Sequence, residues 1–167
     1  FSISSLNIFM KLSFFALTFF VFLSIHAQET FENKALAENM LSMDGDEVTF
    51  EQILEAHKGK PVLIDIWASW CKDCIAGFPK LKELQAKNTQ MDYVFLSLDK
   101  EIDRWKNGIE KYALAGDHYY IKAGWKGDFC TSIDLDWIPR YILLDAKGKI
   151  KVYRAIETTD QNLLNQL

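Results

Sequence analysis

The sequence predicts an α/β fold, in which a sheet carries helices on both of its faces. Residues 62–67 are almost wholly apolar, which is typical of a strand that is buried on both sides. Strand-like and helix-like segments then alternate as far as residue 112. Near the end of the chain, the strand-like segments 138–144 and 150–154 are joined by a short loop with a glycine, which predicts a β-hairpin.

An apolar segment near the start of the chain resembles a secretory signal. It covers residues 12–25, follows Met10 and Lys11, and ends shortly before the small residue Ala27. We expect residues 1–27 to be upstream residues plus a signal peptide that is cleaved near Ala27, which makes the protein periplasmic or exported. An uncleaved membrane anchor is the alternative, and only then do we expect the membrane as a partner.

The rest of the chain is long enough for one domain with a hydrophobic core. Residues 28–47 are polar and show no strong periodicity, so we interpret them as an N-terminal leader on the surface. The domain itself is expected to span residues 48–167. It opens with a short strand at 48–50, followed by a helical pattern that stops near Pro61.

The elements that follow are placed by the spacing of their apolar residues. After the strand at 62–67, helical spacing predicts a helix over 75–85 that contains Pro79. The later elements are a buried strand at 93–98, a helix over 102–112, an extended piece at 118–121, a short helix or loop at 127–135, the hairpin, and a last helix that Thr159 or Asp160 caps.

The charge balance argues against some classes of partner. Without Lys11, 18 basic and 23 acidic side chains remain, so the net charge is near −5. Nucleic acids and anionic membrane surfaces bind clustered positive charge, and we therefore expect no nucleic-acid partner. An exported chain with only three cysteines suits an oxidising space such as a bacterial periplasm, whereas a disulfide-stapled mini-domain would carry more.

Two of the cysteines form the motif Cys71-Lys72-Asp73-Cys74, between the buried strand and the helix that follows it. A thiol at a helix N-terminus faces unpaired N–H groups and the positive end of the helix dipole, which lowers its pKa. This arrangement favours dithiol redox chemistry. Half of a zinc site is the alternative, but such a site needs about four ligands. Neither Cys130 nor the three histidines supply a second ligand pair in the sequence.

With these residues in place, the chain resembles the thioredoxin-like thiol-disulfide oxidoreductases of the TlpA/ResA type. The resemblance spans roughly residue 48 to the end of the sequence. It rests on the order of the elements and on Asp65, Trp67-Ala68-Ser69-Trp70-Cys71-Lys72-Asp73-Cys74, Pro79 and Ile138-Pro139. It implies a thioredoxin fold with a central mixed sheet of four or more strands, flanking helices, and a cis peptide bond before Pro139 opposite the dithiol.

The resemblance also assigns roles to the two thiols. Cys71 is expected to be the nucleophile, and Cys74 the resolving thiol that releases the substrate. Lys72 would favour the Cys71 thiolate and Asp73 would oppose it, so this pair tunes the redox potential. The Cys71–Cys74 disulfide is itself the redox centre, and we expect no further cofactor and no metal.

Asp65 stands in the middle of the apolar strand and matches the buried acid of thioredoxin. Burial would raise its pKa, and the carboxylate could then accept the proton of Cys74 directly or through a water. The alternative is an aspartate at a strand edge, held by backbone hydrogen bonds. Cytochrome-maturation relatives often carry a glutamate just after the dithiol. Gly77 stands at that place here, which argues against apocytochrome as the client.

Three further positions are expected at the dithiol, and the third cysteine is expected away from it. In the family, the backbone beside the cis proline pairs with the substrate, so Ile138 and Pro139 are candidate substrate-binding residues; a trans proline that starts a strand is the alternative. Trp70 is expected to line part of the site. Cys130 is expected to be a buried side chain too far from the dithiol to pair with it, and a third redox thiol is the alternative.

These features predict an exported thiol-disulfide oxidoreductase that exchanges disulfides with protein clients through its Cys-Lys-Asp-Cys dithiol. We expect it to act as a reductant, supplied by an electron donor that the sequence does not identify. A non-catalytic module that holds a metal or a client through Cys71, Cys74 and Cys130 is one alternative. A peroxiredoxin-like peroxidase is another, although it needs a Thr/Ser-x-x-Cys motif and a supporting arginine, which differs from the motif present.

Overall fold

The computed structural model describes residues 30–167, so the predicted signal peptide and its cleavage near Ala27 lie outside the described residues. Within that range, no helix combines the length and the apolar character needed to cross a membrane. The elements follow one another along the chain as α2 (Asn33–Leu36), β1 (Asn39–Ser42), β2 (Glu47–Thr49), α3 (Phe50–Ala56), β3 (Val62–Trp67), α4 (Lys72–Lys87), β4 (Asp92–Ser97), α5 (Ile102–Tyr112), β5 (Asp117–Tyr120), η1 (Gly124–Lys126), α6 (Asp128–Ser132), β6 (Arg140–Leu144), β7 (Ile150–Ala155) and α7 (Gln161–Leu164).

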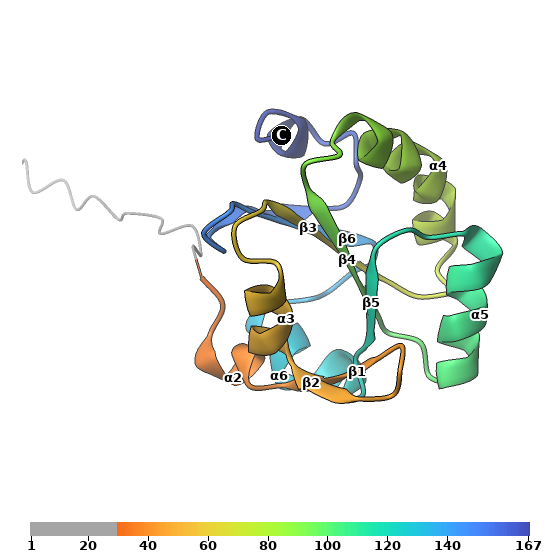
Figure 1. Cartoon of the computed structure of the whole chain (residues 1–167). Coiled ribbons are helices and arrows are strands. Elements are labelled where there is room, and N and C mark those ends of the chain that lie inside the picture. The colour runs from red at the N-terminus through yellow and green to blue at the C-terminus, as the bar shows by residue number, and fades with distance from the viewer. Residues whose placement is uncertain (1–29) are drawn as a thin grey trace, which may run out of the picture.

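The strands form one seven-stranded mixed sheet with the order β2-β1-β5-β4-β3-β6-β7 (Figure 1). Strand β3 pairs in parallel with β4, and β4 in parallel with β5. Strand β6 is antiparallel to β3 and to β7, which closes the predicted hairpin. The α/β class, the thioredoxin fold and the mixed sheet of four or more strands are therefore confirmed.

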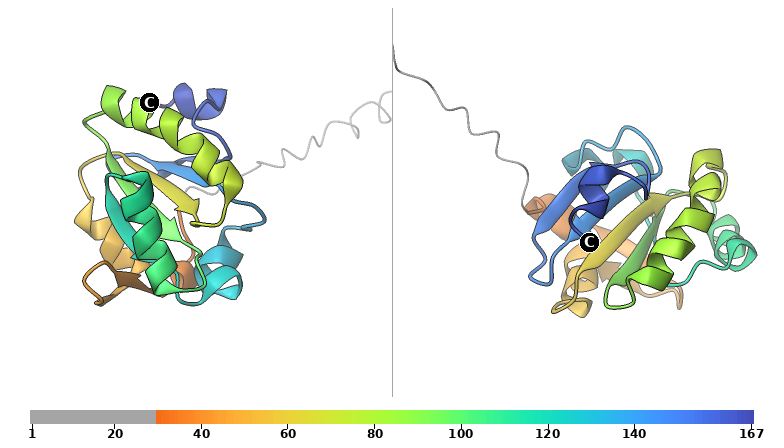
Figure 2. Two further views of the ribbon diagram at one scale, coloured as in Figure 1. Left: turned by 90° about the vertical axis from the view of Figure 1, so that its right-hand side faces the viewer. Right: turned by 90° about the horizontal axis from the view of Figure 1, so that it is seen from above.

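Helices cover both faces of the sheet, with α4 and α5 on one side and α2, α3 and α6 on the other (Figures 1 and 2). Trp67 of β3 packs against Phe78 of α4, with 5.6 Å between ring centroids. On the opposite face, Phe50 of α3 packs against Phe129 of α6 at 4.7 Å. Every residue of β3 is buried, as the unbroken apolar run predicts for a strand covered on both faces.

The interpretation of residues 28–47 as a surface leader is wrong for the described part of this segment. Strand β1 lies inside the sheet, antiparallel to both β2 and β5. Phe31, Ala35 and Met40 are buried in the core. The physical reason is that β5 needs a partner for its outer backbone groups, and a short strand with a single fully buried side chain is enough to supply one. So brief a strand leaves no periodic signal in the sequence.

The other elements lie close to their predicted positions. Thr49 caps α3 with a capping box shared with Gln52, and Asp160 caps α7. The predicted extended piece at 118–121 is β5, a full member of the sheet. Helix α4 begins at Lys72 and continues through Pro79, so the dithiol lies at the helix N-terminus, as predicted.

Candidate active site

Cys71 and Cys74 form a disulfide at the N-terminus of α4. Cys71 is the N-cap residue of the helix, and its Sγ accepts a hydrogen bond from the backbone N–H of Cys74 at 3.1 Å. The same N–H group would stabilise a Cys71 thiolate in the reduced protein. Cys71 keeps 6% of its surface exposed, whereas Cys74 is fully buried. Cys71 is therefore the sulfur that a second protein can reach.

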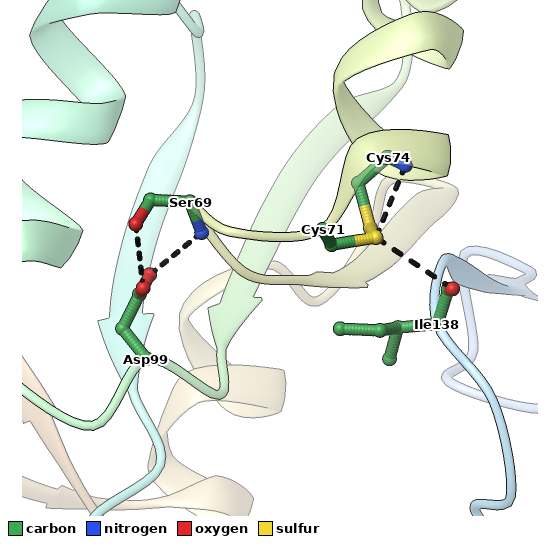
Figure 3. The surroundings of a disulfide bond; sticks show 5 residues. All are labelled: Ser69, Cys71, Cys74, Asp99 and Ile138. Atoms are coloured by element: carbon green, nitrogen blue, oxygen red, sulfur yellow. Dashed lines mark hydrogen bonds between the residues drawn. A yellow bond between two sulfur atoms is a disulfide. The ribbon is translucent and has the colours of Figure 1, made fainter.

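The loop before the dithiol is held by Asp99, a buried residue just beyond β4 (Figure 3). Its carboxylate accepts hydrogen bonds from the Ser69 backbone N–H at 2.9 Å and from the Ser69 hydroxyl at 2.7 Å. The Ser97 hydroxyl adds a third at 2.9 Å. Asp99 was not predicted as a site residue, because in the sequence it follows a strand as an ordinary loop residue does. Its closeness to the end of a buried strand was the available signal.

The peptide bond between Ile138 and Pro139 is cis, as predicted. The carbonyl oxygen of Ile138 lies 3.6 Å from Cys71 Sγ, so this segment faces the dithiol (Figure 3). In the reduced protein that oxygen can accept the hydrogen of the Cys71 thiol. In the described structure, the backbone N–H groups of Trp137 and Ile138 donate to no other residue. They are free to pair with the backbone of an extended ligand.

A buried arginine anchors the segment that leads to Pro139. Arg140 is fully buried, and its Nη2 donates to Asp136 Oδ1 at 2.6 Å. Its Nη1 donates to the carbonyl oxygen of Ile133 at 3.4 Å, and Arg154 also binds Asp136. Because a buried guanidinium needs partners, this pairing ties the backbone on both sides of Trp137 to the body of the domain.

Three tryptophans line the pocket that contains Cys71. Trp70, Trp125 and Trp137 are exposed to 49%, 38% and 56%, and together they line a pocket of about 370 Å³ that also contains Cys71. The two other tryptophans, at 67 and 105, are buried in the core. The remaining residues that line the pocket are Lys72, Asp73, Asp136 and Ile138. The structure thus places Trp70, Ile138, Lys72 and Asp73 at the dithiol and adds Trp125 and Trp137, which sequence analysis missed.

Asp65 is buried in β3, with 2% of its surface exposed. Burial raises the pKa of its carboxyl group to about 8. Within residues 30–167, neither carboxylate oxygen accepts a hydrogen bond, so the alternative of a side chain held by backbone hydrogen bonds does not describe it. Its side chain lies on the face that α4 covers, because Trp67, two residues along the strand, contacts Phe78 of α4.

Cys130 is a free, buried thiol in α6. Burial, together with the nearby Glu38 carboxylate, raises its pKa to about 12, so it stays protonated at neutral pH. This is the behaviour of a small core residue, as predicted. As for metal ligands, the described residues contain no group of three or more His, Cys, Asp or Glu side chains placed to hold an ion.

Fold and site together define a thioredoxin-fold protein with a redox dithiol: a disulfide at the N-terminus of a helix, a cis proline opposite it, and a buried acid in the strand that precedes that helix. A family model described as thioredoxin-like matches residues 59–150, more than half of the chain. The chain belongs to this thioredoxin-like family. Its sequence relatives and structural neighbours agree with this membership.

Among curated proteins, the chain is 29% identical over 115 residues to the thiol:disulfide interchange protein DsbE of Yersinia pestis, which covers 68% of this chain and 57% of that protein. It is 28% identical over 99 residues to the thiol-disulfide oxidoreductase ResA of Bacillus thuringiensis, or 58% of this chain and 56% of ResA. The chain thus spans little more than half the length of these curated relatives.

Solved structures match over more of their length. The thioredoxin domain of a thiol-disulfide oxidoreductase from Bacteroides vulgatus superposes with a TM-score of 0.66 at 26% identity, covering 84% of this chain and 94% of that one. A thiol:disulfide interchange protein from a Bacteroides species gives a TM-score of 0.65 at 26% identity, with 84% and 87% covered.

Proposed function

We propose that this protein is an exported thiol-disulfide oxidoreductase that reduces disulfides in protein clients. The observation that carries the proposal is the position of Cys71: it is the reachable sulfur of a disulfide at a helix N-terminus, 3.6 Å from the carbonyl oxygen beside a cis proline. The names of the DsbE and ResA relatives support the same reaction class. Export is supported by the signal-like segment at residues 12–25.

The reaction follows from the two thiols. The Cys71 thiolate attacks a client disulfide, forms a mixed disulfide with one client sulfur and expels the other as a thiolate. Cys74 then loses its proton and attacks the Cys71 sulfur, which releases the second client thiolate and leaves the Cys71–Cys74 disulfide. Two electrons have passed to the client. The dithiol carries them without a further cofactor, and a donor dithiol must return the protein to its reduced state.

The tryptophan-lined pocket supplies the client-binding surface of this proposal. A client cysteine that reaches Cys71 must pass beside Trp70, Trp125 and Trp137, whose exposed rings bury large apolar side chains well. The free N–H groups of Trp137 and Ile138 can pair with the backbone of the same client segment. We therefore propose extended, cysteine-containing polypeptide segments as the substrate class.

The function is tested by assaying insulin reduction with dithiothreitol as the donor and by measuring the reduction potential of the Cys71–Cys74 pair. We expect the protein to reduce insulin faster than dithiothreitol alone, with a potential below about −200 mV, on the thioredoxin side of the known range. A potential of about −120 mV, typical of oxidant proteins, would instead indicate that the protein forms disulfides in its clients. Stoichiometric binding of zinc or copper without insulin reduction would support the binding-module alternative.

Replacing Trp137 with alanine tests the client-binding surface. We expect KM for insulin to rise about tenfold. An aromatic side chain at the centre of an interface contributes about 1.4 kcal/mol or more to binding, and 1.4 kcal/mol corresponds to a tenfold change in affinity. Reduction of a small disulfide such as oxidised glutathione should change little. Leu164→Ala is the matched control, since Leu164 is an exposed apolar residue outside this pocket. Equal KM values for Trp137→Ala and wild type would remove the pocket from client binding.

A further inference from the structure

Of the two residues directly opposite Asp65 in the neighbouring strands, one has a polar side chain. The register partners of Asp65 are Phe95 on β4 and Tyr141 on β6. Directly opposed residues in neighbouring strands point their side chains to the same face, so both partners lie beside the Asp65 carboxyl group under α4. Phe95 has no polar atom in its side chain. Of these two register partners, Tyr141 is therefore the one that offers Asp65 a polar group.

The Tyr141 side chain reaches from the sheet to α4. A Cβ atom placed on Gly77 would lie 3.4 Å from the Tyr141 hydroxyl oxygen, so the absence of a side chain at Gly77 leaves the phenol room. Tyr141 is 1% exposed, and its hydroxyl has no hydrogen-bond partner in the part of the chain that the structure describes. Burial and the nearby Asp65 charge raise the pKa of Tyr141, so it remains a neutral phenol with a proton to donate.

Tyr141 also borders a pocket of about 280 Å³ between α4 and the segment after β7. Lys80 and Glu157 lie on its walls, whereas Asp65 does not contribute to the lining. Asp65 itself is nearly sealed from solvent. Tyr141 consequently stands between the buried carboxyl group and an opening to solvent.

We propose that the Tyr141 hydroxyl is a positioning residue for Asp65: it donates a hydrogen bond to the ionised carboxylate and connects that group to the pocket beside α4. This inference rests on the proposed function. When Cys74 attacks the Cys71 sulfur, its proton passes to the Asp65 carboxylate. Asp65 later passes that proton to the phenol oxygen while the phenol releases its own to solvent in the pocket. The phenol is neutral before and after, and no electrons are transferred in this step.

The charges around this pair are few. The charged residues that line the pocket beside Tyr141 are Asp73 and Lys80 on α4 and Glu157 after β7, while β4 contributes Phe95. Burial alone accounts for the raised pKa of Asp65, and no charged group counteracts it. A single hydroxyl dipole should therefore have a measurable effect on the proton affinity of Asp65.

Tyr141→Phe removes the hydroxyl and keeps the ring. The Asp65 titration is followed by carbon-13 NMR of its carboxyl group in the oxidised protein, and the midpoint should rise by about one pH unit, because the carboxylate loses its hydrogen-bond donor. The pH profile of insulin reduction should move in the same direction. Adding Tyr141→Phe to Asp65→Asn should change nothing further. Tyr153→Phe is the matched control: its hydroxyl also lacks a partner among residues 30–167, but its charged neighbours are Asp134, Arg140, Arg154 and Glu32.

An unchanged Asp65 midpoint in Tyr141→Phe would overturn the inference. A rate loss of equal size when Tyr141→Phe is introduced into wild type and into Asp65→Asn would do the same, because it would show a packing role only. Failure of the proposed function is distinguishable. Suppose that wild type reduces no insulin but the Asp65 midpoint still moves in Tyr141→Phe. The coupling of the two residues is then supported, and the proposed oxidoreductase function is refuted.

Discussion

Replacing Cys71 with serine is expected to lower insulin reduction to the rate of dithiothreitol alone. Cys71 is the sulfur that is reachable from solvent and stabilised by the helix N-terminus, so no other group can begin the exchange. Cys74→Ser should behave differently, because its intact nucleophile still attacks the client but the mixed disulfide is not resolved. We expect this variant to accumulate a covalent complex with a client, visible on a non-reducing gel and lost on reduction.

Cys130→Ala is the control for this pair of variants. Cys130 is buried in α6 and forms no disulfide, so its removal should leave insulin reduction near the wild-type rate. A trapped complex with Cys71→Ser and none with Cys74→Ser would reverse the two roles. Residual activity in Cys71→Ser that disappears when Cys130→Ala is added would establish a three-thiol mechanism.

Local patterns in the sequence were sufficient to predict most of the fold. Strand β3 is a run of apolar residues, and α3 begins at a capping box, so both are encoded within a few neighbouring residues. Strand β1 is not encoded locally. Its four residues form a strand because β5 and β2 flank it, and its pairing with β5 joins residues about 80 positions apart, such as Leu41 and Tyr120. A strand that depends on such a distant contact leaves no local pattern from which it can be predicted.

The site residues also fall into two groups, those that the sequence predicts and those that only the fold reveals. The dithiol, Asp65 and Pro139 stand out because each breaks the pattern around it: two thiols, a charge in an apolar strand, and a proline ahead of a strand. Trp125 and Trp137 are ordinary aromatic residues in the sequence and become a client surface only when the fold brings them to Cys71. Tyr141 is similar, since a tyrosine in the apolar β6 is typical of a core residue until its register opposite Asp65 is known.

Asp65→Asn is expected to slow insulin reduction by about 10²-fold near pH 7, the usual contribution of a positioned general base. With a pKa of about 8, the wild-type carboxylate becomes available as the pH rises from 7 to 8, so the wild-type rate should climb through this range. The amide cannot accept the proton of Cys74, and this climb should be absent. Above about pH 9 the difference should narrow, because the thiol then ionises without help. Superimposable profiles from pH 6 to 9 would remove Asp65 from the mechanism.

The same substitution should stabilise the oxidised protein. An unfolded aspartate ionises near pH 4, whereas folded Asp65 ionises at about 8. Between these values the folded state holds a proton that the unfolded state has released, so the free energy of unfolding falls as the pH rises from about 4 to about 8. Asparagine has no such proton. In urea unfolding we expect the free energy of unfolding of Asp65→Asn to exceed that of wild type by up to roughly 5 kcal/mol at pH 8, with the difference shrinking toward pH 4.

In Asp65→Asn we expect the reaction rate to fall and the stability to rise, and this combination distinguishes a proton acceptor from a packing residue. A side chain that only fills space would lose both activity and stability when it is altered, whereas Asp65 is a costly buried acid whose removal should help folding and harm the reaction. Asp99→Asn provides the contrast, because Asp99 is also buried but accepts three hydrogen bonds from Ser69 and Ser97. That variant should unfold more easily at pH 8. If Asp65→Asn were less stable than wild type at pH 8, Asp65 would not be an unpaired acid whose burial destabilises the core.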